Sequence, residues 1–350
     1  MKLEQSIIAP EDLILITGSN GFLGVKVVEK FLESGFQNLR CFIRSSGDSS
    51  RLASTLSKFP SAKVEVFEGN LNDPDDCYGA LRDVSVVVNC AAGMRGGLAN
   101  MYIDSVVSSR NLLDASTRRT HVRRIVHISS FAVYETAPIK RGDRLTETAS
   151  LESHHNERNE PYSYTKVKQE EQFWKYAGKY DQPLVVLRPG VIFGPAGREL
   201  SGRVGLQLGR FIIHLGGSNR IPLTYVENCA EAVVLAATKP GIDGEVFNVV
   251  DDDLPTARTF LKQYKAARRN VRSISVHYPV LQLLSRTLTW YSYRSKGQIP
   301  PLLTPHKVAS TWKGVGFDNT KAKKGLGWMP KVPMSAALEA HFEYVRSKHT

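Results

Sequence analysis

The chain has 350 residues, of which 42% are hydrophobic and 23% charged, and its formal net charge at pH 7 is +12. This length suffices for one large α/β domain or for a domain with a smaller lobe, and the composition is typical of a folded globular protein. We expect the positive charge to form a solvated basic surface, with an anionic cofactor, substrate or membrane surface as alternatives. The basic runs are short and scattered, so we expect no nucleic-acid partner.

The cysteines and the amino terminus bear on the compartment. Cys41, Cys77, Cys90 and Cys229 lie far apart, without the spacing of metal ligands, so we expect reduced, mostly buried thiols and no bound metal. The apolar run within residues 1–18 follows acidic residues and is too short for a signal peptide or a membrane span. We therefore expect a cytoplasmic protein, either free or peripheral to a membrane.

The first two-thirds of the chain alternates apolar runs typical of strands with stretches typical of helices. The predicted strands are 13–17, 39–44, 63–69, 84–92, 123–130 and 183–189. Predicted helices include one that ends at Gly35 and one near 98–118. Strands that are apolar on both faces and separated by helices indicate an α/β fold with a Rossmann-type, doubly wound parallel sheet.

The pattern loosens after residue 195. Residues 196–220 are predicted to form a glycine-rich helix-loop, followed by the strand-like EVFNVV and two helical segments. We expect 1–195 to form a nucleotide-binding domain, with further sheet contributions from about 221–252. Most of 196–350 would then form a smaller, interleaved substrate-binding lobe.

A glycine triplet follows the first predicted strand in the stretch ITGSNGFLG. Gly18 permits a tight turn, Gly21 lets backbone N–H groups approach a pyrophosphate, and Gly24 permits close packing of helix on strand. A strand precedes this triplet and a helix follows it, so the stretch predicts a dinucleotide site rather than a structural turn.

The end of the second strand bears on the cofactor's identity. NAD sites usually carry an acid there, which holds the ribose 2′-hydroxyl. This chain has Arg44 followed by Ser45 and Ser46, which suits a 2′-phosphate and predicts NADP(H). An ordinary surface arginine is the alternative, and Asp48 keeps NAD(H) open.

Two overlapping Tyr–Lys pairs occur in the stretch PYSYTKVKQE. Tyr162 precedes Lys166 by four residues, and Tyr164 precedes Lys168 by four. In a helix, residues four apart share a face, whereas residues two apart point about 200° away from each other. We expect the first pair to face the sheet and its cleft and the second to face water. The apolar residues expected beside the first pair are Phe173, Ala177 and Tyr180.

This orientation predicts a proton-transfer role for Tyr162. We expect the Lys166 ammonium to lower the pKa of the Tyr162 phenol. Tyr162 would then exchange a proton with a substrate oxygen while a nicotinamide exchanges hydride at the same carbon. Ser129 and Ser130 follow the fifth strand, and one of them would hold the substrate oxygen, with strand-end capping as the alternative.

Together these stretches resemble the extended short-chain dehydrogenase/reductase superfamily, also called the NAD-dependent epimerase/dehydratase family. The resemblance covers nearly the whole chain and includes TGSNGFLG, EGNLND, NCAAG, SSFAVY, PYSYTK and LRPGVIFGP. It implies Ser130, Tyr162 and Lys166 as the catalytic residues. The cofactor-binding residues that follow from the motif and the resemblance are Gly18, Asn20, Gly21, Phe22, Leu23, Gly24, Arg44, Asn70, Leu71, Ala91, Ala92, Lys166, Pro189 and Val191.

Departures from the family pattern narrow the branch. No Asp-Glu pair follows Ser130, so we do not expect the dehydration route of sugar-nucleotide 4,6-dehydratases. Val191 stands where epimerases usually carry Asn, and Arg220 lies one residue early for the arginine that grips a sugar-nucleotide diphosphate. The stretches YVENCAEAVVLA and PPLLTPHKVAS look like 3β-hydroxysteroid and sterol-4-carboxylate dehydrogenases, and FIRSS looks like the NADPH-using dihydroflavonol reductases.

We therefore expect an NAD(P)-dependent oxidoreductase that interconverts a secondary alcohol and a ketone on a fairly apolar, ring-containing or lipid-like substrate. A nucleotide-sugar epimerase or 4-ketoreductase is the first alternative, and a non-catalytic NADP-binding regulator is the second. Residues 277–298 would lie on a membrane surface, line an apolar substrate entry, or pack on the domain as an amphipathic helix. The resemblance also leaves a homodimer open.

Overall fold

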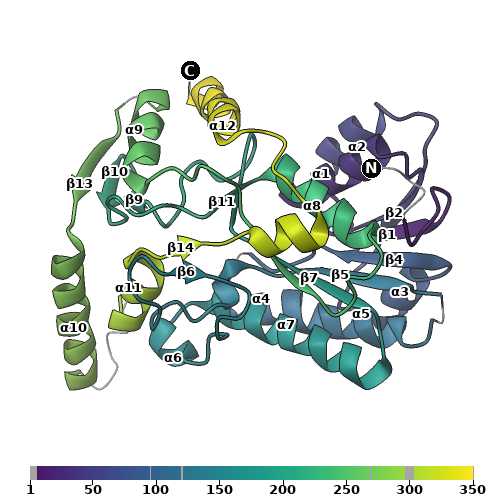
Figure 1. Ribbon diagram of the computed structural model, residues 1–350, viewed down its shortest axis with the longest axis horizontal. Coiled ribbons are helices and arrows are strands. Elements are labelled where there is room, and N and C mark those ends of the chain that lie inside the picture. Colours follow the sequence, from purple (N-terminus) through teal and green to yellow (C-terminus); the bar gives the residue numbers. More distant parts are fainter. Residues whose placement is uncertain (1–5, 95, 120, 269, 296–302, 350) are drawn as a thin grey trace.

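A seven-stranded parallel sheet forms the centre of the molecule (Figure 1), in the order β12-β7-β5-β4-β1-β2-β3. The computed structural model describes residues 6–94, 96–119, 121–268, 270–295 and 303–349. The expected doubly wound sheet is confirmed. Its strands are β1 (Leu13–Thr17), β2 (Asn38–Ile43), β3 (Lys63–Glu68), β4 (Val84–Asn89), β5 (Arg124–Ile128), β7 (Leu184–Pro189) and β12 (Val246–Val249).

Helices cover both faces of this sheet, which explains why its inner strands are buried along their length and mostly apolar. Every residue of β4 and of β7 is buried. One face is covered by α1 (Phe22–Glu33), α2 (Ser50–Leu56) and α8 (Val226–Thr238), and the other by α3 (Pro74–Ala80), α5 (Ser108–Ser116) and α7 (Pro161–Tyr180) (Figure 1).

The single helix predicted near 98–118 is divided in the structure. It consists of α4 (Leu98–Tyr102), a π-helical turn (Ile103–Val107) and α5. The π-helical turn lies next to the end of β4, where the backbone N–H of Gly93 donates to the hydroxyl of Ser105 at 2.8 Å. Turns of this kind often occur at functional sites.

The glycine-rich stretch 196–220 was wrongly predicted as a helix-loop, because it holds an antiparallel hairpin of β9 (Gly205–Leu208) and β10 (Phe211–His214). Gly209, between the two strands, has a φ of 60°, which favours glycine. A Cβ at Gly205 would lie 2.0 Å from the carbonyl oxygen of Ile213, so the hairpin requires a glycine there.

The remaining elements build the smaller lobe and its connections. β13 (Arg272–Ser275) pairs with β10, β11 (Leu223–Tyr225) with β8 (Val191–Phe193), and β14 (Gly316–Phe317) with β6 (Arg144–Leu145). EVFNVV supplies β12, which lies at the edge of the main sheet, while the division of the chain near residue 195 stays a prediction. The other helices are α6 (His155–Arg158), α9 (Ala257–Ala267), α10 (Tyr278–Arg294), α11 (Pro305–Trp312) and α12 (Met334–His349). No helix in the described ranges has the length and apolar character needed to cross a membrane.

Candidate active site

The glycine turn between β1 and α1 is built by close backbone approaches. Gly18 has a φ of 68°, and its carbonyl accepts from the N–H of Gly21 at 2.9 Å. A Cβ at Gly24 would lie 2.0 Å from that carbonyl oxygen, and a Cβ at Gly18 would lie 3.1 Å from the backbone nitrogen of Ala91. The turn therefore depends on glycine at both places, because side chains would push the helix and the end of β4 away.

This turn fits the pyrophosphate of a dinucleotide. No side chain caps the amino end of the twelve-residue helix α1, so its first backbone N–H groups point outward with the positive end of the helix dipole. The neighbouring expected residues lie at the same carboxyl edge of the sheet, where ligands bind in such folds. Asn20, Phe22 and Leu23 belong to the turn and the start of α1, Asn70 and Leu71 follow β3, Ala91 and Ala92 follow β4, and Pro189 and Val191 lie at β7 and β8.

Arg44 follows β2 and is paired in a way that sequence reasoning missed. Its guanidinium forms an ion pair with Asp104 of the π-helical turn at 2.9 Å, and both side chains are partly exposed. The carboxylate of Asp48 accepts the backbone N–H of Ser50 at 2.9 Å and so belongs to a local turn. Asp104 lies 60 residues from Arg44, so no local pattern could have revealed the pair.

Tyr162 lies in the first turn of α7, close to Ser130 at the end of β5. Burial raises the pKa of the Tyr162 phenol, and the negative charge of Glu160 adds to this rise; a hydrogen bond with Ser130 and the positive charge of Arg198 only partly offset it. The expected lowering of this pKa by Lys166 is therefore wrong for the structure. Ser130 also caps the short 3₁₀ turn after β5, since its Oγ accepts the N–H of Ala132 at 3.1 Å.

Lys166 points into the protein beneath the end of β5. It is only 4% exposed, and its Nζ donates to the carbonyl of Ile128 at 2.8 Å and to the side chain of Gln169 at 2.9 Å. Burial lowers the pKa of Lys166 to about 8, although Cys90 and Glu170 oppose the shift. These bonds engage the ammonium away from the Tyr162 phenol, which explains why the expected effect is missing.

Gln169 is a second residue that the sequence analysis missed. It is fully buried, and its amide nitrogen donates to the hydroxyl of Ser109 at 2.8 Å and to the carbonyl of Ser105 at 3.2 Å. Gln169 thereby ties the ammonium of Lys166 to the π-helical turn and α5. Its spacing of three residues from Lys166 on one helix was the available signal.

The second Tyr–Lys pair lies on the outer side of α7. Lys168 forms an ion pair with Glu171 at 2.7 Å, and Tyr164 stacks with Tyr102 at a centroid distance of 6.3 Å. Tyr180, expected on the inner face, is exposed because it lies in the last turn of α7, beyond the covered part of the helix.

A buried ion pair lies behind Ser130. Glu170, on α7, is fully buried, binds the guanidinium of Arg188 from β7 and accepts the hydroxyl of Ser129. Arg188 also lies over the ring of Tyr134 at 4.7 Å. Of the two serines left open by the sequence, Ser129 is thus engaged with Glu170, and Ser130 is the one beside Tyr162.

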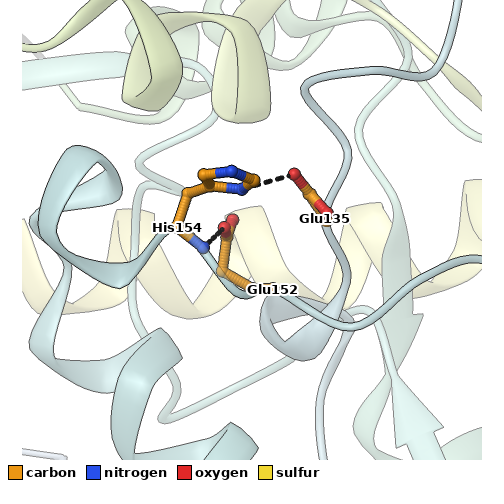
Figure 2. A group of neighbouring side chains, drawn as sticks. All are labelled: Glu135, Glu152 and His154. Carbon is orange, nitrogen blue, oxygen red and sulfur yellow. Dashed lines mark hydrogen bonds and ion pairs between the residues drawn. The ribbon is translucent and has the colours of Figure 1, made fainter.

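Glu135, Glu152 and His154, from the stretch of chain that connects β5 to α7, lie together (Figure 2), with Nδ1 of His154 2.7 Å from Glu135. Glu152 also forms an ion pair with Arg158 at 3.0 Å, and Nε2 of His306 lies 3.1 Å from each of its carboxylate oxygens. Burial favours a raised pKa of Glu152, but hydrogen bonds from His306 and Arg158 lower it overall. The carboxylate is thus already paired, and the absence of a bound metal stays a prediction.

A Rossmann-type sheet, a glycine turn and a Ser–Tyr–Lys set at one sheet edge define an NAD(P)-dependent oxidoreductase of the short-chain dehydrogenase/reductase type. The model of the "NAD dependent epimerase/dehydratase family" matches residues 14–249. The chain belongs to this family, and the resemblance seen in the sequence is confirmed.

Curated relatives match over nearly their full length. The chain is 30% identical to a sterol-4-alpha-carboxylate 3-dehydrogenase (decarboxylating) of Saccharomyces cerevisiae, over 93% of this chain and 96% of the relative. It is 24% identical to a 3 beta-hydroxysteroid dehydrogenase/Delta 5-->4-isomerase of Mycobacterium tuberculosis, over 95% of this chain and 90% of the relative.

Solved structures share the fold. The crystal structure of gox2253 has a TM-score of 0.76 at 22% identity and covers 97% of this chain and 99% of its own. UDP-glucuronic acid 4-epimerase from Bacillus cereus, in complex with NAD, has a TM-score of 0.72 at 19% identity and covers 97% of this chain and all of its own.

Proposed function

We propose that the chain is an NADP(H)-preferring oxidoreductase that interconverts a secondary alcohol and a ketone on a fairly apolar, ring-containing or lipid-like substrate. The observation that carries the proposal is the half-buried phenol of Tyr162, next to Ser130, at the edge of the sheet that holds the glycine turn. The sterol and hydroxysteroid dehydrogenases among the relatives support the choice of substrate class.

The proposed roles are supported by the positions of three side chains. When bound, the nicotinamide gives or accepts the hydride. Tyr162 transfers the proton at the substrate oxygen, and Ser130 holds that oxygen by a hydrogen bond. Lys166, anchored by Gln169 and the Ile128 carbonyl, would hold the nicotinamide ribose.

Arg198 favours a substrate with an anionic group beside the reacting carbon. Its exposed guanidinium is close enough to Tyr162 to affect the pKa of the phenol, and it forms no ion pair with any described residue. An unpaired cation at this place would attract a carboxylate. Sterol-4-alpha-carboxylate dehydrogenases are named among the relatives, which agrees with this choice.

The test is turnover on a panel of hydroxysteroids, sterol carboxylates and their ketones with NADPH, NADP⁺, NADH and NAD⁺. Tyr162→Phe should keep cofactor binding and lose roughly 10²- to 10⁴-fold in turnover. Tyr164→Phe, on the outer side of the same helix, is the matched control and should keep wild-type turnover. A wild-type chain that turns over nothing on the panel, while binding NADP(H), would favour the regulator.

The epimerase alternative makes a separate prediction. An epimerase returns its hydride to the substrate, so it would retain its cofactor through purification and need no added nucleotide. Native mass spectrometry of the purified chain would show such a retained nucleotide. If the chain formed an epimerised product while the redox state of the added cofactor did not change, it would be an epimerase and the proposed dehydrogenase would be wrong. The homodimer also stays a prediction, which light scattering would test.

NADP(H) preference is proposed from Arg44 and its partner Asp104. Arg44→Ala should weaken NADPH binding about tenfold or more while sparing NADH, because only NADPH carries the 2′-phosphate. Asp104→Asn is the matched variant: it releases Arg44 from a competing carboxylate and should strengthen NADPH binding. Isothermal titration calorimetry gives both affinities, and equal effects on the two cofactors would contradict the preference.

A further inference from the structure

The helix α10 turns its apolar side away from the protein. Leu283 and Trp290 are 64% and 66% exposed, and Val280, Leu284 and Tyr291 lie on the same outward arc. The buried positions are instead Leu281, Ser285 and Ser292, two of which carry small polar side chains. A helix packed only as a surface element normally shows the reverse arrangement, with apolar residues inward.

One face of the neighbouring three-stranded sheet is apolar and exposed as well. In its register, Phe211 of β10 lies opposite Leu208 of β9, and Ile213 lies between Leu206 and Ile274. Residues opposite each other, or two apart along a strand, share a sheet face. Leu208 is 63% exposed and Ile274 67%. The other face carries Ile212, which is buried in the core of the lobe.

The sheet face and the helix adjoin each other. Only two residues separate the end of β13 from the start of α10, and Ile213 packs against the cluster that contains Leu281. Both elements lie along one outer edge of the molecule, at the opposite end from β2 (Figure 1). We call this surface the lobe face; its exposed apolar residues are Leu206, Leu208, Phe211, Ile274, Val280, Leu283, Leu284, Leu288, Trp290, Tyr291 and Tyr293.

The net positive charge of the chain comes from the two segments that contain the lobe face together with the helices α9 and α11. Residues 200–226 and 254–317 contain 14 of the 46 Lys and Arg residues and none of the 34 Asp and Glu residues. The rest of the chain is therefore close to neutral, with a net charge of −2. The exposed basic residues on or beside the lobe face form no ion pair with any described residue: Arg210, Arg272, Arg286 and Arg294.

We propose that the lobe face binds peripherally to a bilayer that contains anionic lipid. Apolar and aromatic side chains would enter the headgroup boundary, and the flanking arginines would contact anionic headgroups. The sequence predicted only one part of this surface, residues 277–298, of which 296–298 lie outside the residues that the structure describes. The apolar sheet face was not predicted. The proposal does not depend on the catalytic roles, but it suits an enzyme whose apolar substrate dissolves in lipid.

The charge argues for an anionic bilayer over a second copy of the chain. A symmetric dimer through the lobe face would bring the same surface of two molecules together, so each basic patch would meet another. With no acidic residue in either segment, nothing on the partner could balance that charge. A bilayer with anionic lipid provides negative charge and apolar volume at once.

The experiment is cosedimentation of the full chain with phosphatidylcholine vesicles, with and without phosphatidylserine, at low and high salt. We expect binding that needs phosphatidylserine and weakens with salt. Neutralising Arg210, Arg272 and Arg286 to Gln should reduce the partition constant roughly a hundredfold, since each basic residue near an anionic surface contributes about a factor of five. The matched control neutralises Arg118, Arg141 and Lys175, exposed elsewhere, and should bind like the wild type.

The apolar contribution is tested separately. Leu283→Ser with Trp290→Ser should reduce binding at least tenfold, whereas Met329→Ser, which removes an exposed apolar side chain elsewhere, should not. Tryptophan fluorescence should shift to the blue on vesicle addition, because Trp290 is exposed on the lobe face, whereas Trp312 and Trp328 are already buried and the partly buried Trp174 lies on α7. Tyr162→Phe should bind vesicles like the wild type, which separates this proposal from the catalytic one. The proposal would be overturned if all variants still bound vesicles. It would also be overturned if the wild type did not bind vesicles but formed a dimer without lipid, and the lobe-face variants dissociated that dimer.

Discussion

Lys166 is an ammonium group held where water hardly reaches it. Its two hydrogen bonds bring no carboxylate into direct contact, so burial still favours the neutral amine. The pKa of about 8 in the folded chain lies below the ordinary value of 10.5. The protein thus keeps a group near its protonation midpoint at mildly alkaline pH, at a cost in stability at neutral pH.

The stability of the fold should therefore depend on pH through Lys166. Between pH 8 and 10.5 the unfolded chain holds this proton more strongly than the folded chain, so stability rises with pH in that window. From about pH 7 to 9.5, the free energy of unfolding of the wild type should increase by about 2 kcal/mol relative to Lys166→Met. Urea unfolding at both pH values measures this. Lys168→Met, on the exposed side of α7, is the control and should follow the wild type.

The pH dependence of turnover should depend on the residues near Tyr162. Because burial raises the pKa of the phenol, alcohol oxidation should accelerate at alkaline pH, where the phenolate forms. Arg198 opposes this rise, so Arg198→Gln should move the pH profile of kcat to higher pH and raise KM for a carboxylate substrate. Arg141→Gln, remote and exposed, should change neither. An unchanged profile in Arg198→Gln would separate Arg198 from the reaction.

At the scale of elements, α7 connects the site to the sheet. Its inner side carries Lys166 and Glu170, and Glu170 binds Arg188 of the neighbouring strand β7. Burial lowers the pKa of Arg188, but the carboxylate of Glu170 and the hydroxyl of Tyr134 raise it above its ordinary value overall. The guanidinium therefore stays charged. This ion pair orients the helix against the end of the sheet.

Breaking this buried pair should be costly, whereas replacing both partners should cost less. Glu170→Gln leaves the Arg188 charge buried without its carboxylate and should lower the free energy of unfolding by about 3–5 kcal/mol. The double variant Glu170→Leu with Arg188→Met should lose less free energy of unfolding than Glu170→Leu or Arg188→Met alone. Glu171→Gln, which breaks the exposed pair with Lys168 one position along, should cost at most about 0.5 kcal/mol. Urea unfolding at neutral pH compares these variants with the wild type; a small loss in Glu170→Gln would contradict the argument.

At the scale of the molecule, the proposed cofactor site exists only when distant elements come together. The glycine turn follows β1, Ala91 follows β4, and Lys166 lies on α7, so the unfolded chain cannot bind a dinucleotide as the folded chain does. A ligand of this kind stabilises the folded state by about 2.7 kcal/mol at a hundredfold excess over its Kd. The gain in stability is thus a measure of the intact site.

NADPH should raise the free energy of unfolding by that amount in the wild type. Gly24→Ala should lose the NADPH-dependent gain, because its Cβ would lie 2.0 Å from the Gly18 carbonyl oxygen and displace the turn. Gly178→Ala is the matched control, since a Cβ there meets nothing within 4 Å; it should keep the full gain and be slightly more stable without ligand. Urea unfolding with and without NADPH gives both quantities, and a gain that persists in Gly24→Ala would contradict the proposed turn.

Features set by neighbouring residues could be predicted from the sequence. The parallel sheet, the turn at Gly18 and the opposite faces of α7 follow from local apolar periods, from glycine spacing and from helix geometry. The same reasoning was wrong for 196–220. The hairpin there depends on the close approach of Gly205 to Ile213, and the glycine content of the stretch does not predict this contact.

What the sequence by itself determined is the fold class, the family and which residue types stand at each strand end, because these depend on spacing along the chain. Only the tertiary structure decided that Arg44 binds Asp104, that Lys166 is held away from the Tyr162 phenol, and that the apolar side of α10 faces outward. Each of these depends on residues far apart in the chain, or on which side of an element another element covers. Burial and pairing then set the charge and the reach of each group, and in these three cases the local pattern did not reveal them.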